Sequence, residues 1–137
     1  MSTLSIPDLR AFLAREFPQI EGTYVVDDAG PMRARMRLLS GERHLRPGGT
    51  ISGPAMFGLA DVALYAAILV SVGPVGHAVT TNLNINFLRK PAPVDLIGEA
   101  RLLKLGKRLA VGEVSIFESA GEELVAHATG TYSIPPH

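Results

Sequence analysis

The first segment with a clear hydrophobic pattern has the periodicity of a helix. Apolar side chains recur at three- and four-residue spacing over residues 5–17, as they do on one face of an amphipathic helix. They are Ile6, Leu9, Phe12, Leu13 and Phe17. Ser5 or Asp8 suits the start of this helix, and Pro18 ends it. We therefore expect a short N-terminal helix.

Two stretches of alternating hydrophobicity follow. Residues 23–27 and 32–39 predict a pair of strands around a turn at 27–31. In the second stretch apolar side chains alternate with arginines, which predicts one buried face and one positively charged face. The apolar members are Met32, Ala34, Met36 and Leu38, and the arginines are Arg33, Arg35 and Arg37.

The longest apolar run covers residues 53–73. A glycine-rich bend at 46–53 precedes it, Pro54 is acceptable in a first helical turn, and Gly73 with Pro74 ends it. Its side chains are apolar nearly all round, which is typical of a helix that is buried on most sides. The run is long enough to cross a membrane. A central acid, Asp61, and the strand-like segments that follow favour a buried helix instead, so we expect no membrane association.

Four further strands are predicted after this helix. They cover residues 77–88, 95–105, 110–119 and 123–134, and turn residues separate them. Three consecutive hairpins would give an antiparallel meander. The order of helix, two strands, long helix and four strands indicates the α+β class. A sheet of six strands wrapped around one long helix is the hotdog fold, and we expect residues 1–137 to form one such domain.

Composition narrows the range of functions. The 13 Lys and Arg residues balance the 13 Asp and Glu residues, so there is no basic excess of the kind that indicates nucleic-acid binding. The chain has no cysteine, which removes disulfides and thiolate sites, and its histidines lack the spacing of metal ligands. We expect no metal. The first ten residues lack the pattern of a secretory signal, so we expect a cytoplasmic protein.

Asp61 is the strongest candidate for chemistry. It is the only carboxylate among residues 47–88. Burial of an unpaired carboxylate costs several kcal/mol, so such a group is either satisfied by a backbone amide or a partner subunit's arginine, or it has a function. Tyr65 lies one turn later on the same helix face. It is placed either to hydrogen-bond Asp61 or a water, or to serve as a core residue.

The start of the long helix resembles a known enzyme family. Residues 52–61, Ser-Gly-Pro-Ala-Met-Phe-Gly-Leu-Ala-Asp, are similar to the motif of hotdog acyl-CoA thioesterases of the phenylacetic-acid-degradation type. In that family a His-Gly-Gly triplet is followed, seven residues after its last glycine, by the catalytic aspartate. Asp61 has this register. Residues 82–89 and 126–132 are also similar, and the resemblance runs from about residue 20 to the C-terminus.

This chain departs from the family pattern at three positions. Ser52 stands at the family's histidine, Pro54 at its second glycine, and Arg46 at the asparagine of the bend. Pro54 has no backbone N–H, so only the amides of Gly53 or Ala55 are left to hold a substrate oxygen there. Ser52 is suited either to cap the helix or to contact substrate.

The resemblance implies hydrolysis of an acyl-CoA or aryl-CoA thioester. The amides and dipole at the helix start would polarise the carbonyl, and Asp61 would act as a general base on water or as a nucleophile. No cofactor is implied beyond the coenzyme A of the substrate. Basic side chains expected near its phosphates, or else ordinary turn charges, are Arg46, Arg89, Lys90, Lys107 and Arg108.

Open sheet edges favour pairing between chains, so we expect a homodimer or homotetramer. Two other functions stay open. A non-catalytic module that binds acyl-CoA or an aryl ligand is consistent with Ser52 and Pro54 at the family's His and Gly positions. A hotdog dehydratase or hydratase pairs its acid with a histidine, and no histidine lies near Asp61 in the sequence.

Overall fold

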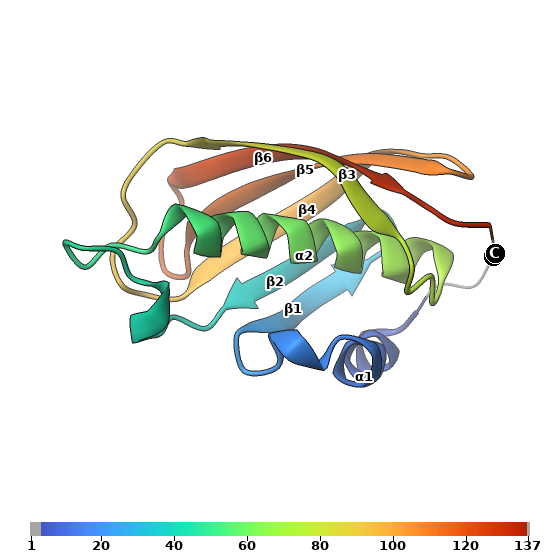
Figure 1. Ribbon diagram of the computed structural model, residues 1–137, viewed down its shortest axis with the longest axis horizontal. Helices are drawn as coiled ribbons and strands as arrows, with labels where there is room; N and C mark the ends of the chain where they lie inside the picture. Colours follow the sequence, from blue (N-terminus) through green and yellow to red (C-terminus); the bar gives the residue numbers. More distant parts are fainter. Residues whose placement is uncertain (1–3, 137) are drawn as a thin grey trace.

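The helices and strands form close to where the hydrophobic pattern predicts them. The computed structural model describes residues 4–136. In chain order the elements are α1 (Ile6–Glu16), η1 (Pro18–Ile20), β1 (Tyr24–Gly30), β2 (Arg33–Leu38), η2 (Glu42–His44), α2 (Gly53–Val72), β3 (Val79–Phe87), β4 (Leu96–Leu105), β5 (Leu109–Glu118) and β6 (Leu124–Ser133). The strands form one antiparallel sheet that curves around α2 (Figure 1). The predicted α+β hotdog fold is confirmed.

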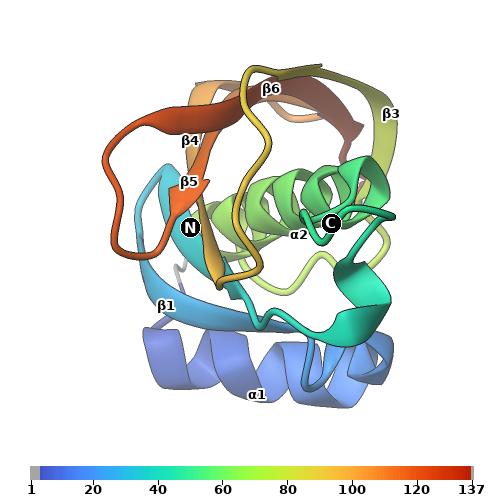
Figure 2. The same ribbon diagram turned by 90° about the vertical axis from the view of Figure 1, so that its left-hand side faces the viewer.

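Helix α1 starts and stops at the expected signals. The Ser5 Oγ accepts a hydrogen bond from the Asp8 N–H at 3.2 Å, which satisfies one of the free amides of the first turn. Its apolar face buries Leu9, Phe12 and Leu13. Helix α1 lies beside β1 at one side of the sheet (Figure 2).

The hairpin between β1 and β2 differs from the expectation in one respect. Strand β1 continues through the predicted turn to Gly30, and Met32 lies in the turn instead of in the second strand. Met32 has a positive φ of 68°, and its N–H donates to the Ser71 Oγ at 2.8 Å. This bond to the end of α2 stabilises a backbone conformation that is uncommon for a non-glycine residue.

The outer face of β2 is not simply positive, so that prediction is wrong. Its arginines pair with acids of the neighbouring strands: Arg33 with Asp28 at 2.9 Å, Arg37 with Asp27 at 3.1 Å, and Arg35 with Glu99. The alternation in β2 correctly predicted which side chains are buried, but the acids that pair with the arginines come from other strands. Such partly exposed pairs contribute little to stability, roughly 0–1 kcal/mol each.

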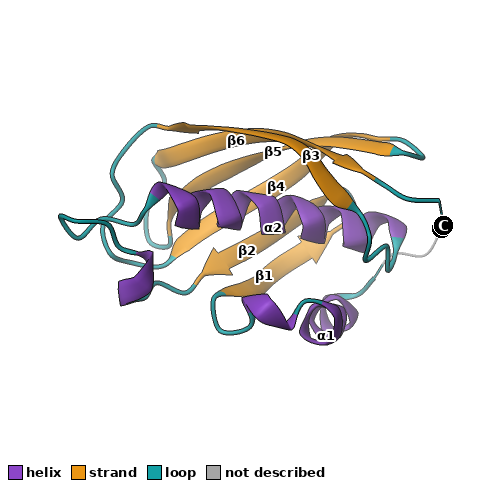
Figure 3. Ribbon diagram, viewed as in Figure 1, coloured by secondary structure: helices purple, strands orange, loops and turns teal. Residues whose placement is uncertain are grey.

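Helix α2 lies on the concave side of the sheet (Figure 3). It has the length and apolar composition of a membrane span, and 78% of its most apolar window is buried inside the fold. The sheet approaches it closely where glycines lack a side chain. Gly98 lies beneath Leu59, and Leu64 lies over Gly112 and Gly130, which are paired across β5 and β6.

The strand order is β1-β2-β4-β5-β6-β3, so the prediction of three consecutive hairpins is wrong. Strands β4, β5 and β6 form a meander, whereas β3 pairs with β6 at the far edge. Residues 88–95 therefore cross the end of the sheet instead of forming a turn (Figure 1). Helix α2 carries the chain across the concave face from β2 to the opposite edge, where β3 pairs with β6 (Figure 1).

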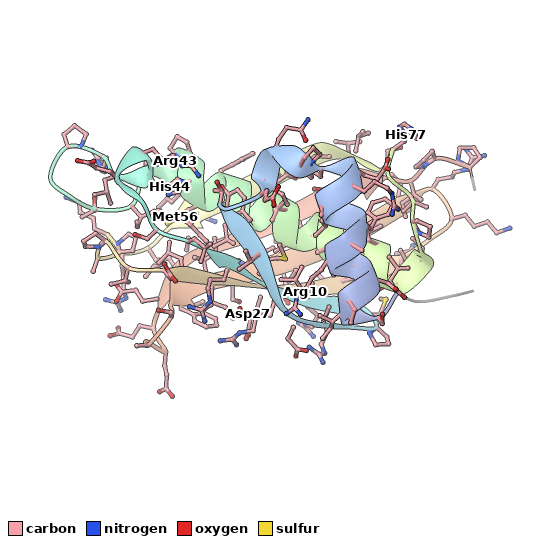
Figure 4. The ribbon with its side chains drawn as sticks, turned by 90° about the horizontal axis from the view of Figure 1, so that it is seen from below. Arg10, Asp27, Arg43, His44, Met56 and His77 are labelled. Carbon is pink, nitrogen blue, oxygen red and sulfur yellow. The ribbon has the colours of Figure 1, made fainter. Side chains whose placement is uncertain are left out.

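The two edge strands, β1 and β3, differ in what lies against their outer side. The Arg10 Nη2 of α1 donates to the main-chain carbonyl of Val26 in β1 at 2.9 Å, and Figure 4 shows this side chain between α1 and β1. Strand β3 has β6 on one side, and no other strand of the described chain pairs with its second side. Most of its nine residues are exposed.

The glycine contacts beneath α2 give a stability prediction. A Cβ at position 112 would lie 2.6 Å from the Leu64 Cδ2 and 2.9 Å from the Arg101 carbonyl oxygen. Gly112→Ala should therefore lower the free energy of unfolding by about 1–3 kcal/mol, measured by urea denaturation, because overpacking forces shifts in helix or sheet. Gly121→Ala is the control, since its nearest atom lies at 3.5 Å. Equal stabilities of the two variants would contradict this reading of the helix–sheet contact.

Candidate active site

The start of α2 presents one free amide. The Ser52 Oγ accepts a hydrogen bond from the Ala55 N–H at 3.3 Å, so Ser52 is the N-cap of the helix. The Ser52 carbonyl accepts the Met56 N–H at 3.2 Å, and Pro54 has no N–H. Within residues 4–136 the Gly53 N–H has no hydrogen-bond acceptor, so it is the amide that remains available.

Asp61 is half-buried, and both hydroxyls that donate to its side chain bind the same carboxylate oxygen. The Thr80 Oγ1 donates to the Asp61 Oδ1 at 2.5 Å. The Tyr132 hydroxyl lies 2.5 Å from the same Oδ1 and 2.7 Å from the Asp61 main-chain carbonyl, so its proton bridges the two acceptors. No donor of the described chain contacts Oδ2. The carboxylate therefore has one held oxygen and one free oxygen.

The two donors come from neighbouring strands. Thr80 of β3 and Tyr132 of β6 are paired in register on the face that looks toward α2. The Tyr132 ring stacks on Tyr65 of α2 with centroids 6.4 Å apart, which holds the hydroxyl at Asp61. Burial raises the pKa of Tyr132, and the negative charge of Asp61 raises it further. Tyr132 is thus a protonated donor throughout the physiological range.

Asp61 opens into a cleft of about 580 Å³. Helix α2 supplies one wall, the start of β3 and the end of β6 a second, and the end of α1 with η1 a third. The rings that line it are those of Phe17, Tyr24, Tyr65 and Tyr132. A concave, mostly apolar space with a few converging polar groups is the usual form of a small-molecule site.

Tyr65 and Tyr24 line this cleft with their hydroxyls engaged elsewhere. The Tyr65 hydroxyl donates to the Gly76 carbonyl at 3.1 Å, not to Asp61. The Tyr24 hydroxyl donates to the Ala55 carbonyl at 3.1 Å and fills the space where a Cβ at Gly58 would lie. Burial raises the pKa of Tyr24, while the Arg43 guanidinium opposes this rise and the Asp61 carboxylate adds to it.

The basic candidates lie at two ends of the molecule. Arg46 is exposed in the bend before α2, and Arg89 pairs with Glu123 at 2.7 Å beside Lys90. Lys107 and Arg108 lie in the turn between β4 and β5, at the other end of α2 (Figure 1). One chain alone does not bring all five together. In the described part of the chain no three His, Asp or Glu side chains are grouped to hold a metal, and His44 and His77 lie far apart in Figure 4.

Gly53 and Asp61 are too far apart to act on the same atom. They are eight residues apart on one helix. At 1.5 Å of rise per residue this separation is about 12 Å along the axis. A carbonyl oxygen at the Gly53 amide of one chain is therefore beyond the reach of a water or an attack from Asp61 of the same chain.

Sequence reasoning missed Thr80 and Tyr132. Both lie within predicted strands, and no local pattern distinguishes them from other strand residues. Tyr132 is 71 positions from Asp61 and Thr80 is 19 positions away, so only the strand pairing brings them to the acid. Of the residues that the resemblance indicated, Gly53 and Asp61 lie on α2 and Ser52 is its N-cap, as expected from the start and length of the helix.

Comparison with known proteins places this chain in a family. A model of the thioesterase superfamily matches residues 48–125, which is more than half of the chain and includes Gly53, Asp61 and Thr80. A Pseudomonas aeruginosa protein provisionally assigned as an esterase is 31% identical over 127 residues, which cover 86% of this chain and 93% of that protein.

Solved structures agree in fold. A protein of Silicibacter sp. TM1040, provisionally assigned as a thioesterase, is 49% identical with a TM-score of 0.90, over 99% of this chain and 95% of that one. A variant of the phenylacetic acid degradation protein PaaI of Thermus thermophilus is 26% identical with a TM-score of 0.74, over 86% of this chain and 99% of that one. From the family match and the esterase relative it follows that this chain belongs to the thioesterase superfamily.

Proposed function

We propose that this protein hydrolyses an acyl-CoA or aryl-CoA thioester to the free acid and coenzyme A. The observation that carries the proposal is the Asp61 carboxylate in a mostly apolar cleft, with Oδ1 held by two hydroxyls and Oδ2 without a donor among residues 4–136. Membership of the thioesterase superfamily supports the reaction class. The substrate class rests on the resemblance to the phenylacetic-acid-degradation group.

In the proposed reaction the free oxygen of Asp61, Oδ2, is the reacting group. Acting as a general base, Oδ2 takes a proton from a water whose oxygen then adds to the thioester carbon. The negative charge moves to the carbonyl oxygen, where a helix N-terminal amide stabilises it. When the C–S bond breaks, Asp61 returns the proton to the leaving sulfur. As a nucleophile, Asp61 would instead attack the thioester carbon and expel the coenzyme A thiolate, which takes a proton from solvent. Water would then hydrolyse the resulting mixed anhydride to the free acid and the Asp61 carboxylate.

The separation of Gly53 and Asp61 requires a second subunit in this proposal. Thr80, beside Asp61, lies near the start of β3, and Phe87, beside Gly53, lies at its end. If the free edge of β3 pairs with a second copy in antiparallel fashion, centred between residues 83 and 84, Phe87 of the partner subunit comes opposite Thr80. The amide of Gly53 of the partner subunit then approaches Asp61. We propose that the active site forms across such a homodimer.

The exposed apolar side chains beside β3 support this pairing. Phe57 and Phe87 are 40% and 51% exposed. Together with Ile85, Pro54 and Gly53 they line an apolar hollow of about 420 Å³. A dimer that uses this edge would bury the hollow and remove large apolar side chains from water.

The same pairing also gathers the basic candidates. It brings the β4–β5 turn of one chain, with Lys107 and Arg108, toward the end of the partner that carries Arg46, Arg89 and Lys90. Coenzyme A has several phosphate charges that arginine and lysine bind well. We propose that cations from both chains hold its phosphates outside the cleft.

The first test removes the proposed base. Asp61→Asn keeps the size of the side chain and an oxygen for Thr80 and Tyr132, but it cannot accept a proton from water. We expect kcat for acyl-CoA hydrolysis to fall by about 10²–10⁴-fold or more, measured as thiol release from a panel of acyl- and aryl-CoA thioesters. Wild-type turnover that survives the change would remove Asp61 from the mechanism. Tight binding without any turnover in the wild type would favour a binding module instead.

A second test concerns the two hydrogen bonds that Asp61 Oδ1 accepts. Thr80→Val and Tyr132→Phe each remove one donor to Oδ1. A hydrogen bond to a charged group contributes about 1.5–3 kcal/mol, so kcat should fall by roughly 10–100-fold with a small change in KM. Thr80→Ser keeps the hydroxyl and should retain activity. Thr81→Val is the matched control, because the Thr81 hydroxyl donates to the Thr131 carbonyl and not to Asp61. If Thr81→Val and Thr80→Val lost activity equally, the positioning role of Thr80 would be wrong.

A third test asks whether the site spans two chains. Gly53→Pro deletes the free amide, and proline suits both the first helical turn and the extended Ser52 before it (φ −73°, ψ 154°). We expect a loss of about 10²–10³-fold in kcat, whereas Gly53→Ala, which keeps the N–H, should lose far less.

Coexpression of the two inactive chains distinguishes sites within and between subunits. In a mixed dimer of Asp61→Asn and Gly53→Pro chains, one of the two composite sites is intact. Random pairing should restore about a quarter of wild-type activity, because half of the dimers are mixed. No restoration in verified mixed dimers would contradict a composite site.

A further inference from the structure

Two hollows lie on either side of one side chain, Phe17. The first is the Asp61 cleft of about 580 Å³. The second is an apolar groove of about 240 Å³ between α1 and β1. The two share three lining residues, Phe17, Ile20 and Tyr24, so these side chains form the partition between them.

The charges of the cleft indicate which end of a thioester enters it. Its lining includes two carboxylates, Glu16 and Asp61, and no Lys, Arg or His of the described chain. The phosphates of coenzyme A would find no cation there, so they belong outside. The acyl end of the substrate therefore occupies the cleft, and an acyl group with its own carboxylate would be repelled.

Among the three residues of the partition, Phe17 is the one whose replacement can open a passage between the two hollows. Ile20 packs in the core at 9% exposure. Tyr24 is tied to the Ala55 carbonyl at 3.1 Å and packs against Gly58. Phe17 is half-buried at the end of α1, and its ring meets Tyr65 edge-on with centroids 6.0 Å apart.

The backbone explains why Phe17 lies there. It is the C-cap of α1, with φ −137° and ψ 56°, and Pro18 prevents the helix from continuing. The chain bends at this residue, so the ring lies between α1 and Tyr65 of α2. Tyr65 in turn stacks on Tyr132, which holds Asp61. Phe17, Tyr65 and Tyr132 thus form an aromatic row that ends at Asp61.

We propose that Phe17 sets the length of the acyl group, and that the protein selects uncharged acyl groups that end at this ring. The inference rests on the proposed thioesterase function of the cleft. In the wild type, Phe17 closes the Asp61 cleft from the groove beneath α1. A longer apolar chain would have to displace the ring from its contact with Tyr65.

The experiment is a chain-length profile. The kcat/KM of the wild type, Phe17→Ala and Phe17→Trp is measured with straight-chain acyl-CoA thioesters from acetyl to dodecanoyl. Phe17→Ala joins the two hollows, so its optimum should move to longer chains, with a gain of about 4-fold for each methylene that enters the added apolar space. Phe17→Trp should move the optimum to shorter chains. Glutaryl-CoA should be a poorer wild-type substrate than hexanoyl-CoA.

Phe12→Ala is the matched control. Phe12 is a phenylalanine of the same helix, 6% exposed, and it lines neither hollow. Its replacement should lower stability without changing the position of the optimum. The proposal is overturned if Phe17→Ala and Phe17→Trp are active with the wild-type profile, or if Phe12→Ala shifts the optimum equally. A wild type that hydrolyses none of the thioesters would instead contradict the proposed function itself.

Discussion

The structure depends on the burial of one helix that has no polar face. Fifteen residues of α2 are buried, so the protein must supply apolar contacts almost all round it. The sheet does so by curving, and glycines in β4, β5 and β6 let it approach the helix closely. One six-stranded sheet does not enclose the helix completely. The remaining side, between the end of α1 and the start of β3, is where Asp61 faces the cleft.

The environment of Asp61 treats its two oxygens differently, because both side-chain donors bind Oδ1. A carboxylate in a mostly apolar cleft needs hydrogen-bond donors, and an arginine or a backbone amide would supply them at the cost of neutralising or fixing the group. Within the described chain the donors are two hydroxyls, both on Oδ1. They satisfy the acid without adding a positive charge to the site.

Much of the fold could be predicted from the sequence because periodicity is a local property. Alternation in β2 correctly predicted that Ala34, Met36 and Leu38 are buried. The isolation of Asp61 in an apolar run singled it out as a candidate, and in the structure it lines the cleft. The position of β3 was missed, because the pattern of a strand shows that one face is buried and not which strand lies beside it. The pairing of Thr80 with Tyr132, and hence the donors of Asp61, depends on that neighbour.

The two edges of the sheet, β1 and β3, differ in how much of their backbone is free to pair with a strand of another chain. At the β1 edge, α1 lies beside the strand and Arg10 occupies the Val26 carbonyl, so part of the row of amides and carbonyls at this edge is already engaged. At the β3 edge the row is free within the described chain. Strand pairing through the β3 edge alone would join two copies and then stop. Such an edge would favour one partner without leading to a growing fibre.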